Sequence, residues 1–469
     1  MTRSIVVGSG PNGLTGAITL AAAGLDVTVL EAAETPGGGL RSHEATVPGL
    51  IHDMCSAFHP LSTRSSFARR FDLTQHGLQW AWPSVQYAHP LDDGTGGAAL
   101  RSVDETAAGL GVDGAAYRRL FGPLAGRFDE LAADILRPVL HVPRHPVTLA
   151  RYGLASTLPA TTLARWWQTP QARGLWAGVA AHAFHPLTSP MSSAAGLVLG
   201  TATHRYGWPV AVGGSGAIAR AMIALLTSLG GRIETGVRVE SYAPLADADV
   251  VLLDTSPRAA TAILGDRLPA RVARAYRRYR HGPGAFQVSL AVEGGIPWTY
   301  EPARRSGTVH VGGTLEEITE AERSSWSGQM PARPFVLVGQ QAVADPSRAR
   351  GDVQPIDAYA HVPHGFTGDA TTAILDQIER FAPGTRERIV AVSTRSTAQL
   401  ERENANLIGG DISNGANTAL QLVFRPRVAL DPYSTGVPGV YLCSSATPPG
   451  GGAHGLCGYG AAQAALARL

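Results

Sequence analysis

Lysine is absent from this sequence of 469 residues, and all 39 basic side chains are arginines. An arginine guanidinium stays protonated in proteins and does not serve as an amine nucleophile. Mechanisms that require an ammonium side chain are therefore excluded, among them Schiff-base catalysis and the phosphate-binding lysine of a P-loop.

Other features that the sequence lacks exclude further classes of protein. Cysteine occurs three times, which is too few and too scattered for a disulfide framework or a zinc cluster. The formal net charge is only +2, so charge gives no case for binding nucleic acid. No apolar run of about 18 residues occurs, and the opening MTRSIVVGSG is too short for a signal-peptide core. We therefore expect a cytoplasmic protein.

Glycine is abundant, with 55 residues, and its first cluster follows a short apolar segment. Residues 4–7 predict a strand, and Gly-Ser-Gly-Pro-Asn-Gly follows at 8–13. A helix is expected over 14–23, and a second strand over 26–30 runs directly into Glu31. Strand, glycine turn, helix, strand and acid in this order are typical of a dinucleotide-binding unit.

Each part of this unit has a physical role. Gly8 allows a tight turn, Gly10 lets the backbone approach a pyrophosphate, and Gly13 lets helix and strand pack closely. The unpaired N–H groups of the helix N-terminus then face the phosphates. An ionised Glu31 would accept a hydrogen bond from a ribose hydroxyl and disfavour a 2′-phosphate.

A second glycine cluster follows in the stretch AAETPGGGLRS, where residues 37–39 precede Arg41. The chain of a nicotinamide-dependent dehydrogenase would leave its cofactor at this point. The cluster favours a ligand that continues past the pyrophosphate, as FAD does along its ribityl chain. A flexible loop is the alternative.

The stretch VVGSGPNGL…VTVLEAAETPGGGLRS resembles the opening of the phytoene dehydrogenase-like (carotenoid desaturase-related) flavoproteins, which are part of the broader amine oxidase/glutathione reductase-type superfamily. The resemblance covers roughly residues 1–62, 205–260 and 405–469. It implies FAD as the cofactor, with Glu31 on the adenosine ribose and Arg41 near the flavin end.

A second nucleotide site has to be weighed in residues 210–237, where Gly-Ser-Gly at 214–216 precedes Glu234. Pro209 leaves only three strand residues before this turn, and Glu234 lies inside its expected strand. We therefore favour a single dinucleotide site, which leaves NAD(P)H without an evident place. The resemblance instead implies that this segment returns the chain to the FAD domain, with the Val237 backbone on the adenine.

The stretch GVYLCSSATPPGGGAHGLCGYGAAQAAL, residues 439–466, resembles the C-terminal signature of the same family. Its glycines would let the backbone pass the isoalloxazine edge, and the last helix would point its partial positive charge at flavin N1–C2=O. The family usually has glycine followed by alanine or an acid at Ser444 and Ser445, whose hydroxyls still suit a ribityl or phosphate oxygen. The cofactor-binding residues implied by motif and resemblance are Gly8, Gly10, Pro11, Asn12, Gly13, Glu31, Ala32, Gly38, Gly39, Leu40, Arg41, Val237, Ser445, Gly451, Gly452, His454 and Gly455.

The fold class expected is α/β. A Rossmann-type FAD-binding domain is assembled from the discontinuous segments 1–75, 205–285 and 405–469, and a mixed α/β substrate-binding domain is formed by 76–204 and 286–404. Such interruption is expected when a substrate domain is inserted into a nucleotide-binding fold.

Two histidines are candidate catalytic residues. The resemblance places His454 beside the flavin pyrimidine, with a helix-capping role as the alternative. It also brings the segment 50–61 past the flavin, which makes His59 a candidate and allows covalent flavin attachment at Cys55 or His59; ordinary packing is favoured there. Neither this segment nor the His361-x-x-His364 pair, expected on a loop before a helix, has the spacing of a metal site, so no metal is predicted.

Residues 137–170 combine arginines and histidines with leucine and the pair Trp166-Trp167. They fit an interfacial segment through which a lipid substrate enters from a membrane. A buried pair of helices with a rim of arginines is the favoured alternative.

The predicted activity is hydride transfer between a C–C unit of a small, apolar, lipophilic substrate and flavin N5, as in a desaturase or saturase. Flavin N5 performs the chemistry in such enzymes, and oxygen or a quinone would accept the electrons. An amine or amino-acid oxidase is the alternative, although many such relatives hold a water at N5 with a lysine. A reduced-flavin isomerase or a non-enzymatic flavoprotein is a third hypothesis.

Overall fold

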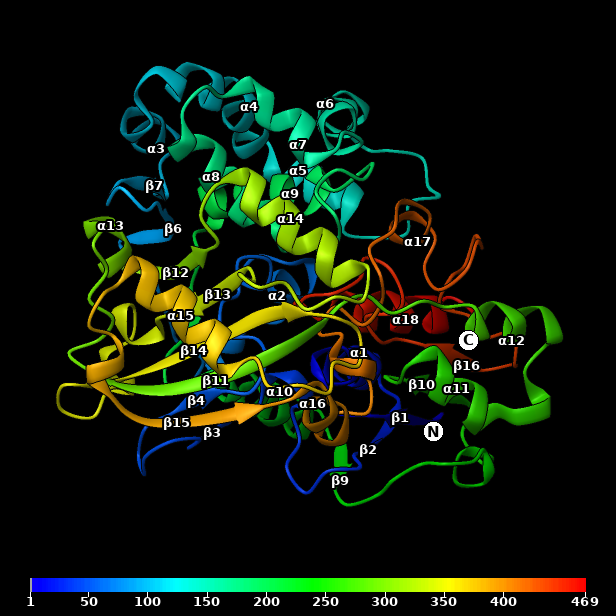
Figure 1. Ribbon diagram of the computed structural model, residues 1–469. Helices are drawn as coiled ribbons and strands as arrows, with labels where there is room; N and C mark the ends of the chain where they lie inside the picture. The colour runs from blue at the N-terminus through cyan, green and yellow to red at the C-terminus, as the bar shows by residue number, and fades with distance from the viewer. Residues whose placement is uncertain (1) are drawn as a thin grey trace.

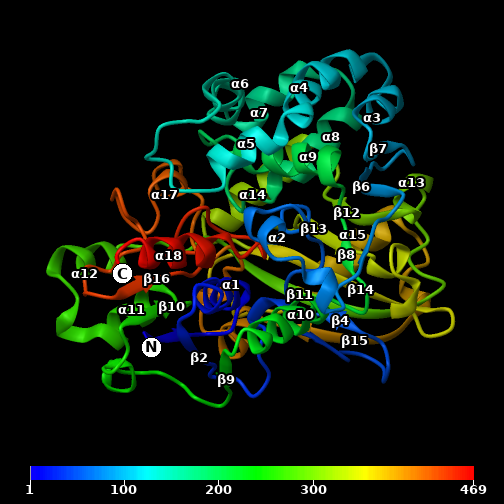
Figure 2. The same ribbon diagram turned by 180° about the vertical axis from the view of Figure 1, so that it is seen from behind.

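Two sheets and a layer of helices make up the computed structural model, which describes residues 2–469 (Figure 1). The first sheet has five strands in the order β16-β10-β1-β2-β9. The second has seven strands in the order β15-β11-β14-β13-β12-β6-β7. Helices α3 to α9 lie together at the top of Figures 1 and 2, on the side away from the five-stranded sheet.

The five-stranded sheet is parallel throughout and comes from separate parts of the chain. Its strands carry runs of valine, isoleucine and leucine because helices cover both faces. They are β1 (Arg3–Val7), β2 (Asp26–Leu30), β9 (Arg232–Glu234), β10 (Val250–Leu253) and β16 (Val440–Leu442). The predicted α/β class, with a Rossmann-type sheet built from discontinuous segments, is confirmed.

Helix α1 (Pro11–Ala21) is the centre of this part of the molecule, and it packs against α10 (Gly216–Ser228) and α18 (Leu456–Leu466). The contact with α18 requires a glycine. A Cβ added at Gly458 would lie 1.7 Å from the Asn12 carbonyl oxygen, far inside van der Waals contact. The first and last helices of the chain can therefore pack backbone to backbone (Figure 2).

The seven-stranded sheet is antiparallel except where β12 meets β6. One face is covered by α15 (Thr371–Phe381), which buries Ile374, Ile378 and Phe381. The strands are β6 (Val85–Pro90), β7 (Gly96–Ala99), β11 (Gly284–Glu293), β12 (Ser306–Val311), β13 (Val336–Gly339), β14 (Val353–Val362) and β15 (Ile389–Arg395).

The helical layer packs on the sheet through α8, which contacts β6, β7 and β12. Its interior is rich in aromatic side chains; for example, the Tyr117 and Phe121 rings lie 4.6 Å apart. The helices are α3 (Val103–Gly109), α4 (Gly114–Gly126), α5 (Phe128–Ile135), α6 (Pro146–Ser156), α7 (Ala160–Leu163), α8 (Pro170–Ala181), α9 (Ser193–Tyr206) and α14 (Leu315–Trp326).

Short elements complete the fold. Two antiparallel pairs join β3 (Ser42–His43) to β4 (His52–Asp53) and β5 (Trp80–Ala81) to β8 (Val210–Ala211). The other helices are α2 (Ser66–Arg70), α11 (Pro257–Leu264), α12 (Ala270–Arg277), α13 (Glu301–Arg304), α16 (Thr397–Glu403) and α17 (Ala419–Val423). None of the helices within residues 2–469 combines the length and apolar character needed to cross a bilayer.

A buried polar network ties the β3–β4 hairpin to the seven-stranded sheet. His52 Nδ1 lies 2.8 Å from an Asp357 oxygen on β14, and Arg348 donates to Asp53 over 2.8 Å. Burial alone would raise the pKa of Asp357, but His52 and Arg348 hold it well below the usual range. These ion pairs fix the hairpin, and with it the approach of the N-terminal segment to β14.

Two sequence interpretations are decided by the strand pairings. Strand β8 pairs with β5 rather than with β9, so residues 210–237 do not form a second βαβ unit. The expectation that His361 lies on a loop was wrong, because it belongs to β14 and is buried 2.7 Å from Glu322. Pairing with β11 extends the strand through the histidine, because His361 lies opposite Ala285. The domain boundaries proposed from the sequence stay a prediction.

The contact between α1 and α18 gives a first testable prediction. We expect Gly458→Ala to lower the free energy of unfolding by about 1–3 kcal/mol or more, because the new methyl group has to push the two backbones apart. Urea unfolding measures this change. Gly122→Ala in α4, where an added Cβ meets nothing within 4 Å, is the matched control and should be neutral or stabilising by about 0.5–1 kcal/mol. Equal losses in both variants would contradict the close contact.

Candidate active site

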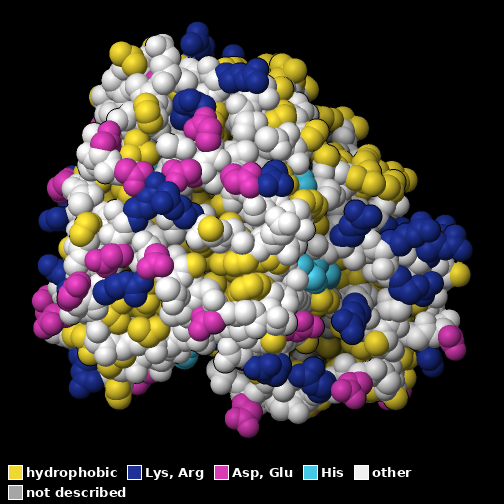
Figure 3. All heavy atoms as spheres, viewed as in Figure 1, with side chains coloured by type: hydrophobic (Ala, Val, Ile, Leu, Met, Phe, Trp, Pro, Cys, Tyr) yellow, Lys and Arg dark blue, Asp and Glu magenta, His cyan; other side chains and the backbone are white. Residues whose placement is uncertain are grey.

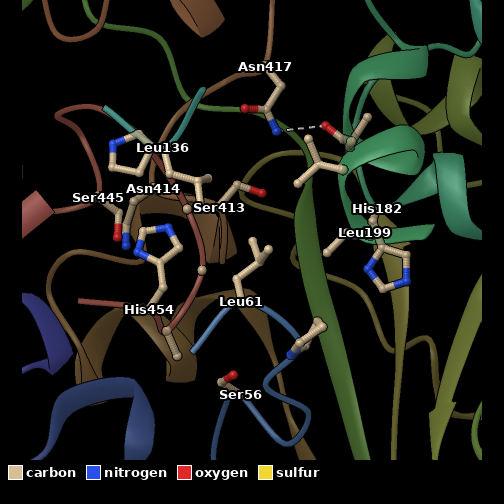
Figure 4. A pocket seen from close by; sticks show the side chains of 18 of the residues that line it. Ser56, Leu61, Leu136, His182, Leu199, Ser413, Asn414, Asn417, Ser445 and His454 are labelled. Atoms are coloured by element: carbon tan, nitrogen blue, oxygen red, sulfur yellow. Dashed lines mark hydrogen bonds between the residues drawn. The ribbon is translucent and has the colours of Figure 1, made fainter. Parts of the chain in front are cut away.

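A cavity of about 730 Å³ lies between the carboxyl edge of the five-stranded sheet and the helical layer. Its walls come from distant parts of the chain, so the site exists only in the folded molecule (Figure 4). They include the turn 10–12, residues 55–62 and 134–141, parts of α6 and α9, residues 182–184 after α8, the strand residues Thr308, Leu337, Gly339 and Tyr359, and the segments 404–425 and 445–454.

The glycine turn after β1 forms a cradle at one end of the cavity. Gly8 has φ of +98°, and a Cβ added at Gly13 would lie 2.0 Å from the Gly8 carbonyl oxygen. Added Cβ atoms at Gly10 and Gly38 would lie 2.7 Å from Asp254 Oδ2 and 2.8 Å from Gly10 Cα. Glycine at these positions lets the turn, residue 38 and Asp254 pack together at the N-terminus of α1. The cradle therefore fits the pyrophosphate of a dinucleotide.

Glu31 is held in one orientation at the end of β2. Its Oε2 accepts hydrogen bonds from the N–H and the hydroxyl of Ser9 at 2.8 and 2.5 Å, and its Oε1 accepts one from the Ala33 N–H at 2.8 Å. A carboxylate has about four acceptor positions, so it can still accept from a ribose hydroxyl. The Val237 N–H donates to the Glu31 carbonyl oxygen at 2.8 Å, which leaves the Val237 carbonyl as its backbone group for an adenine.

Some of the predicted cofactor residues lie away from the cavity wall. Arg41 donates to the Gly38 and Glu403 carbonyl oxygens, the Leu40 side chain is in the core, and Ala32 is exposed. The predicted residues that line the cavity are Gly10, Pro11, Asn12, Gly39, His59, Ser445, Gly451, Gly452 and His454. The predicted residues outside its wall are Gly8, Gly13, Glu31, Ala32, Gly38, Leu40, Arg41, Val237 and Gly455.

Asp254 is a cavity residue that the sequence interpretation missed. It follows β10 directly, and its Oδ2 accepts a hydrogen bond from the Gly13 N–H at 2.9 Å. Burial raises the pKa of Asp254 to about 7; the Glu31 charge adds to this effect, and the Gly13 hydrogen bond opposes it. The available signal was an acid at the end of a buried strand of the Rossmann sheet, where parallel strands place functional side chains.

The two candidate catalytic histidines both line the cavity and are both buried. The Leu456 N–H donates to His454 Nδ1 at 3.1 Å, so His454 does cap α18 as the alternative interpretation had it. The Ser215 hydroxyl donates to the Ser56 carbonyl, and it can therefore accept from His59 Nε2 at 2.9 Å. Burial lowers the pKa of each histidine to about 4, so both are uncharged at neutral pH.

The C-terminal glycines serve mainly to bring protein segments together. Added Cβ atoms at Gly455 and Gly450 would lie 2.1 Å from Thr15 Oγ1 and 2.8 Å from Arg425 Nη1. Asn12 Nδ2 also donates to Ser445 Oγ at 3.2 Å, across the start of α1. Contacts with α1 and with Arg425 thus account for glycine at positions 455 and 450, without reference to a flavin.

The far end of the cavity is apolar, and its polar groups are paired and neutral. Phe184, Leu199 and Tyr359 line it, together with His182, whose Nε2 lies 2.9 Å from His310 Nε2. One of these two nitrogens carries a proton and donates it, and the other accepts through its lone pair. Burial lowers the pKa of His182 to about 3 and that of His310 well below its usual value.

The cavity wall contains two acidic residues, and neither is free to bind a cation. Asp254 belongs to the glycine cradle. Asp134 accepts hydrogen bonds from the Arg144 N–H, the His145 N–H and His141. The apolar end of the cavity therefore offers no carboxylate to an ammonium group.

Comparisons with known proteins agree with this architecture. A family model described as an NAD(P)-binding Rossmann-like domain matches residues 6–71. The pyridine nucleotide-disulfide oxidoreductase domain-containing protein 2 of Rattus norvegicus is 24% identical over 98% of this chain and 92% of its own. Among solved structures, an oxidoreductase from Methanosarcina mazei has 14% identity and a TM-score of 0.65, covering 99% of this chain and 100% of its own. A putrescine oxidase variant has 17% identity and a TM-score of 0.62, covering 100% and 99%.

Sheet order, glycine cradle and these matches together indicate an oxidoreductase enzyme with the FAD-type flavoprotein fold. Its cofactor class is a flavin or a pyridine nucleotide. The comparisons support this broad superfamily and do not single out the phytoene dehydrogenase-like proteins within it.

Asp254 gives a prediction on pH. The unfolded carboxyl loses its proton near pH 4 and the folded one near pH 7, so the folded protein without cofactor should lose stability as the pH rises between these values. The loss is about 4 kcal/mol at most. Asp254→Asn keeps an acceptor for the Gly13 N–H and removes the ionisation, so its free energy of unfolding should depend less on pH. Urea unfolding of both proteins at pH 5 and pH 8 measures the difference; parallel pH profiles would refute it.

Proposed function

We propose that the protein is an FAD-dependent oxidoreductase that moves a hydride between a C–C unit of a lipophilic substrate and flavin N5, as a desaturase or saturase does. The observation that carries this proposal is the single cavity that joins the glycine cradle to an apolar wall. A lipophilic substrate can lie along that wall with one end directed at the cofactor.

The residues of the cradle fit FAD. Glu31 would take the adenosine ribose, the α1 N-terminus the pyrophosphate, and Ser445 and Gly451 the ribityl and flavin end. The flavin would supply hydride acceptance or donation at N5.

The chain's apolar wall excludes water and orients the substrate. His59 is uncharged and its Nδ1 has no partner in the protein, so it would accept the proton that leaves the carbon next to the hydride donor. His454 is also uncharged, but its Nδ1 accepts from the Leu456 N–H and its proton lies on Nε2, so it would act as a hydrogen-bond donor.

An amine oxidase is the second candidate, because a putrescine oxidase shares the fold. The cavity argues against it. The acids in its wall are occupied or belong to the cradle, and the chain has no lysine. Since residues 210–237 do not form a second dinucleotide unit, we further propose oxygen or a quinone as the electron acceptor rather than NAD(P)H.

The function is tested on purified protein. We expect it to bind one FAD per chain, visible as flavin absorbance, and the bound flavin to bleach without oxygen when an apolar substrate with a saturated C–C unit is added. If the enzyme works in the reducing direction, the chemically reduced flavin should instead be reoxidised by a polyene. Bleaching by a panel of primary amines, with no response to apolar compounds, would favour an amine oxidase. Protein that takes up no flavin would refute both assignments.

The cavity mouth suggests how such a substrate enters. Residues of two segments line the cavity: Val139, Leu149 and Thr157 of the segment 139–157, and Leu422 and Val423 of the segment 420–430. The same two segments expose eight large apolar side chains: Val139, Leu140, Val142, Val147, Leu154, Leu420, Val428 and Leu430. Figure 3 shows apolar side chains gathered at the upper right, near the place of α17 in Figure 1; the arginines below them at the far right lie where Figure 1 shows α12.

We propose that this mouth rests on a membrane surface. Exposed apolar side chains with neighbouring arginines, such as Arg144 and Arg151, are suited to anionic lipid. The protein should sediment with vesicles that contain phosphatidylserine, and the double variant Val142→Glu/Leu154→Glu should lose most of this binding. Val390→Glu/Val392→Glu on β15 is the matched control and should bind as the wild type does. Equal binding by both variants would contradict the proposal.

A further inference from the structure

Two arginines of the protein are almost fully buried, and only one of them has an acidic partner. Arg348 and Arg425 are each 1% exposed. Arg348 forms an ion pair with Asp53 at 2.8 Å. Within residues 2–469, no carboxylate oxygen lies within 4 Å of the Arg425 guanidinium.

Arg425 is held instead by neutral acceptors. Its Nη2 donates to Asn417 Oδ1 at 2.8 Å, its Nη1 to the Ser445 carbonyl at 3.2 Å and its Nε to the Gln421 carbonyl at 3.3 Å. Taking a charge out of water costs several kcal/mol, and neutral acceptors offset this only in part. Five N–H donors make three hydrogen bonds here, so two remain for another partner.

The surroundings of Arg425 indicate where that partner lies. The guanidinium lines the cavity and lies against the glycine loop, since a Cβ added at Gly450 would be 2.8 Å from Nη1. Tyr279 and Cys457 face it from the protein side and are uncharged at neutral pH, because burial raises the pKa of each to about 12. Asp411 also lies near Tyr279, but its oxygens accept hydrogen bonds from the N–H groups of Gly282, Ser413 and Gly415.

We propose that Arg425 is the counter-charge for the negative charge that the bound flavin gains at N1–C2=O when it is reduced. This inference rests on the proposed function, which sets the flavin beside residues 450–452. Arg425 acts on the flavin through its charge and takes no part in bond making, so it is an electrostatic positioning residue. Its effect adds to that of the α18 N-terminus on the same loop.

The consequence is a shift in equilibrium between oxidised and reduced flavin. Removing the charge should weaken the binding of reduced flavin more than that of oxidised flavin. We expect at least a tenfold difference for Arg425→Gln, which corresponds to a reduction potential lower by about 30 mV for a two-electron couple. Sulfite, which adds to flavin N5 and leaves negative charge on the ring, should bind at least tenfold more weakly.

The experiment uses the flavin-loaded full chain. Arg425→Gln is compared with the wild type by dye-coupled reduction and by sulfite titration followed in the flavin absorbance. Arg427→Gln is the matched control; this arginine, two residues away, bonds to backbone carbonyls of residues 431 and 434. Its potential and sulfite affinity should stay at wild-type values.

A second variant covers the case in which Arg425→Gln does not fold. Asn417→Asp places a carboxylate on the acceptor of Arg425 and neutralises the guanidinium without removing it. It should lower the potential and the sulfite affinity in the same direction. Asn417→Ala removes the same acceptor and the hydrogen bond to the Ala183 carbonyl, which Figure 4 shows, but adds no negative charge, so it should lower neither the potential nor the sulfite affinity.

The outcomes separate this inference from its alternatives. Unchanged potential and sulfite affinity in Arg425→Gln and Asn417→Asp would overturn it. A raised KM for acidic substrates at unchanged potential would also overturn it, because Arg425 would then bind a substrate carboxylate. Wild-type protein that takes up no flavin would refute the proposed function itself. If the wild type binds flavin but Arg425→Gln has the same reduction potential, only this inference is refuted.

Discussion

The backbone contact between α1 and α18 is the constraint on which the rest of the structure depends. Gly458 lies against the Asn12 carbonyl and Gly455 against Thr15, so the last helix can reach the glycine turn that follows the first strand. Asn12 then donates to Ser445. Because the two ends of the chain meet here, the cradle and the C-terminal loop face one cavity.

The electrostatic character of the cavity follows from what is buried around it. His59, His182 and His454 are held neutral, the acids of the cavity wall are satisfied within the protein, and Arg425 is the buried cation that lacks an acid. In a medium of low polarity, such an arrangement favours electron-rich groups over cations. The same set of buried groups that disfavours a cationic amine substrate thus favours a flavin that becomes negatively charged on reduction.

The parts of the fold that local pattern specifies could be predicted from the sequence. The βαβ unit, the strand and helix of residues 439–466 and the apolar face of α15 depend on glycine spacing and periodicity within short windows. Asp254 and Arg425 could not be found in this way, because their roles depend on hydrogen bonds with Gly13 and Ser445, respectively, which are not their neighbours in the sequence. His361 was placed on a loop because a proline and a glycine follow it, although the strand continues to Val362.

The ion pairs of the β3–β4 hairpin bear on how the molecule can move. His52 with Asp357 and Asp53 with Arg348 tie the hairpin to the seven-stranded sheet inside the protein, where separating either pair would expose a buried charge. The hairpin is therefore held in one position against β14, and the cavity wall of residues 55–62, which follows it in the chain, is fixed at that end.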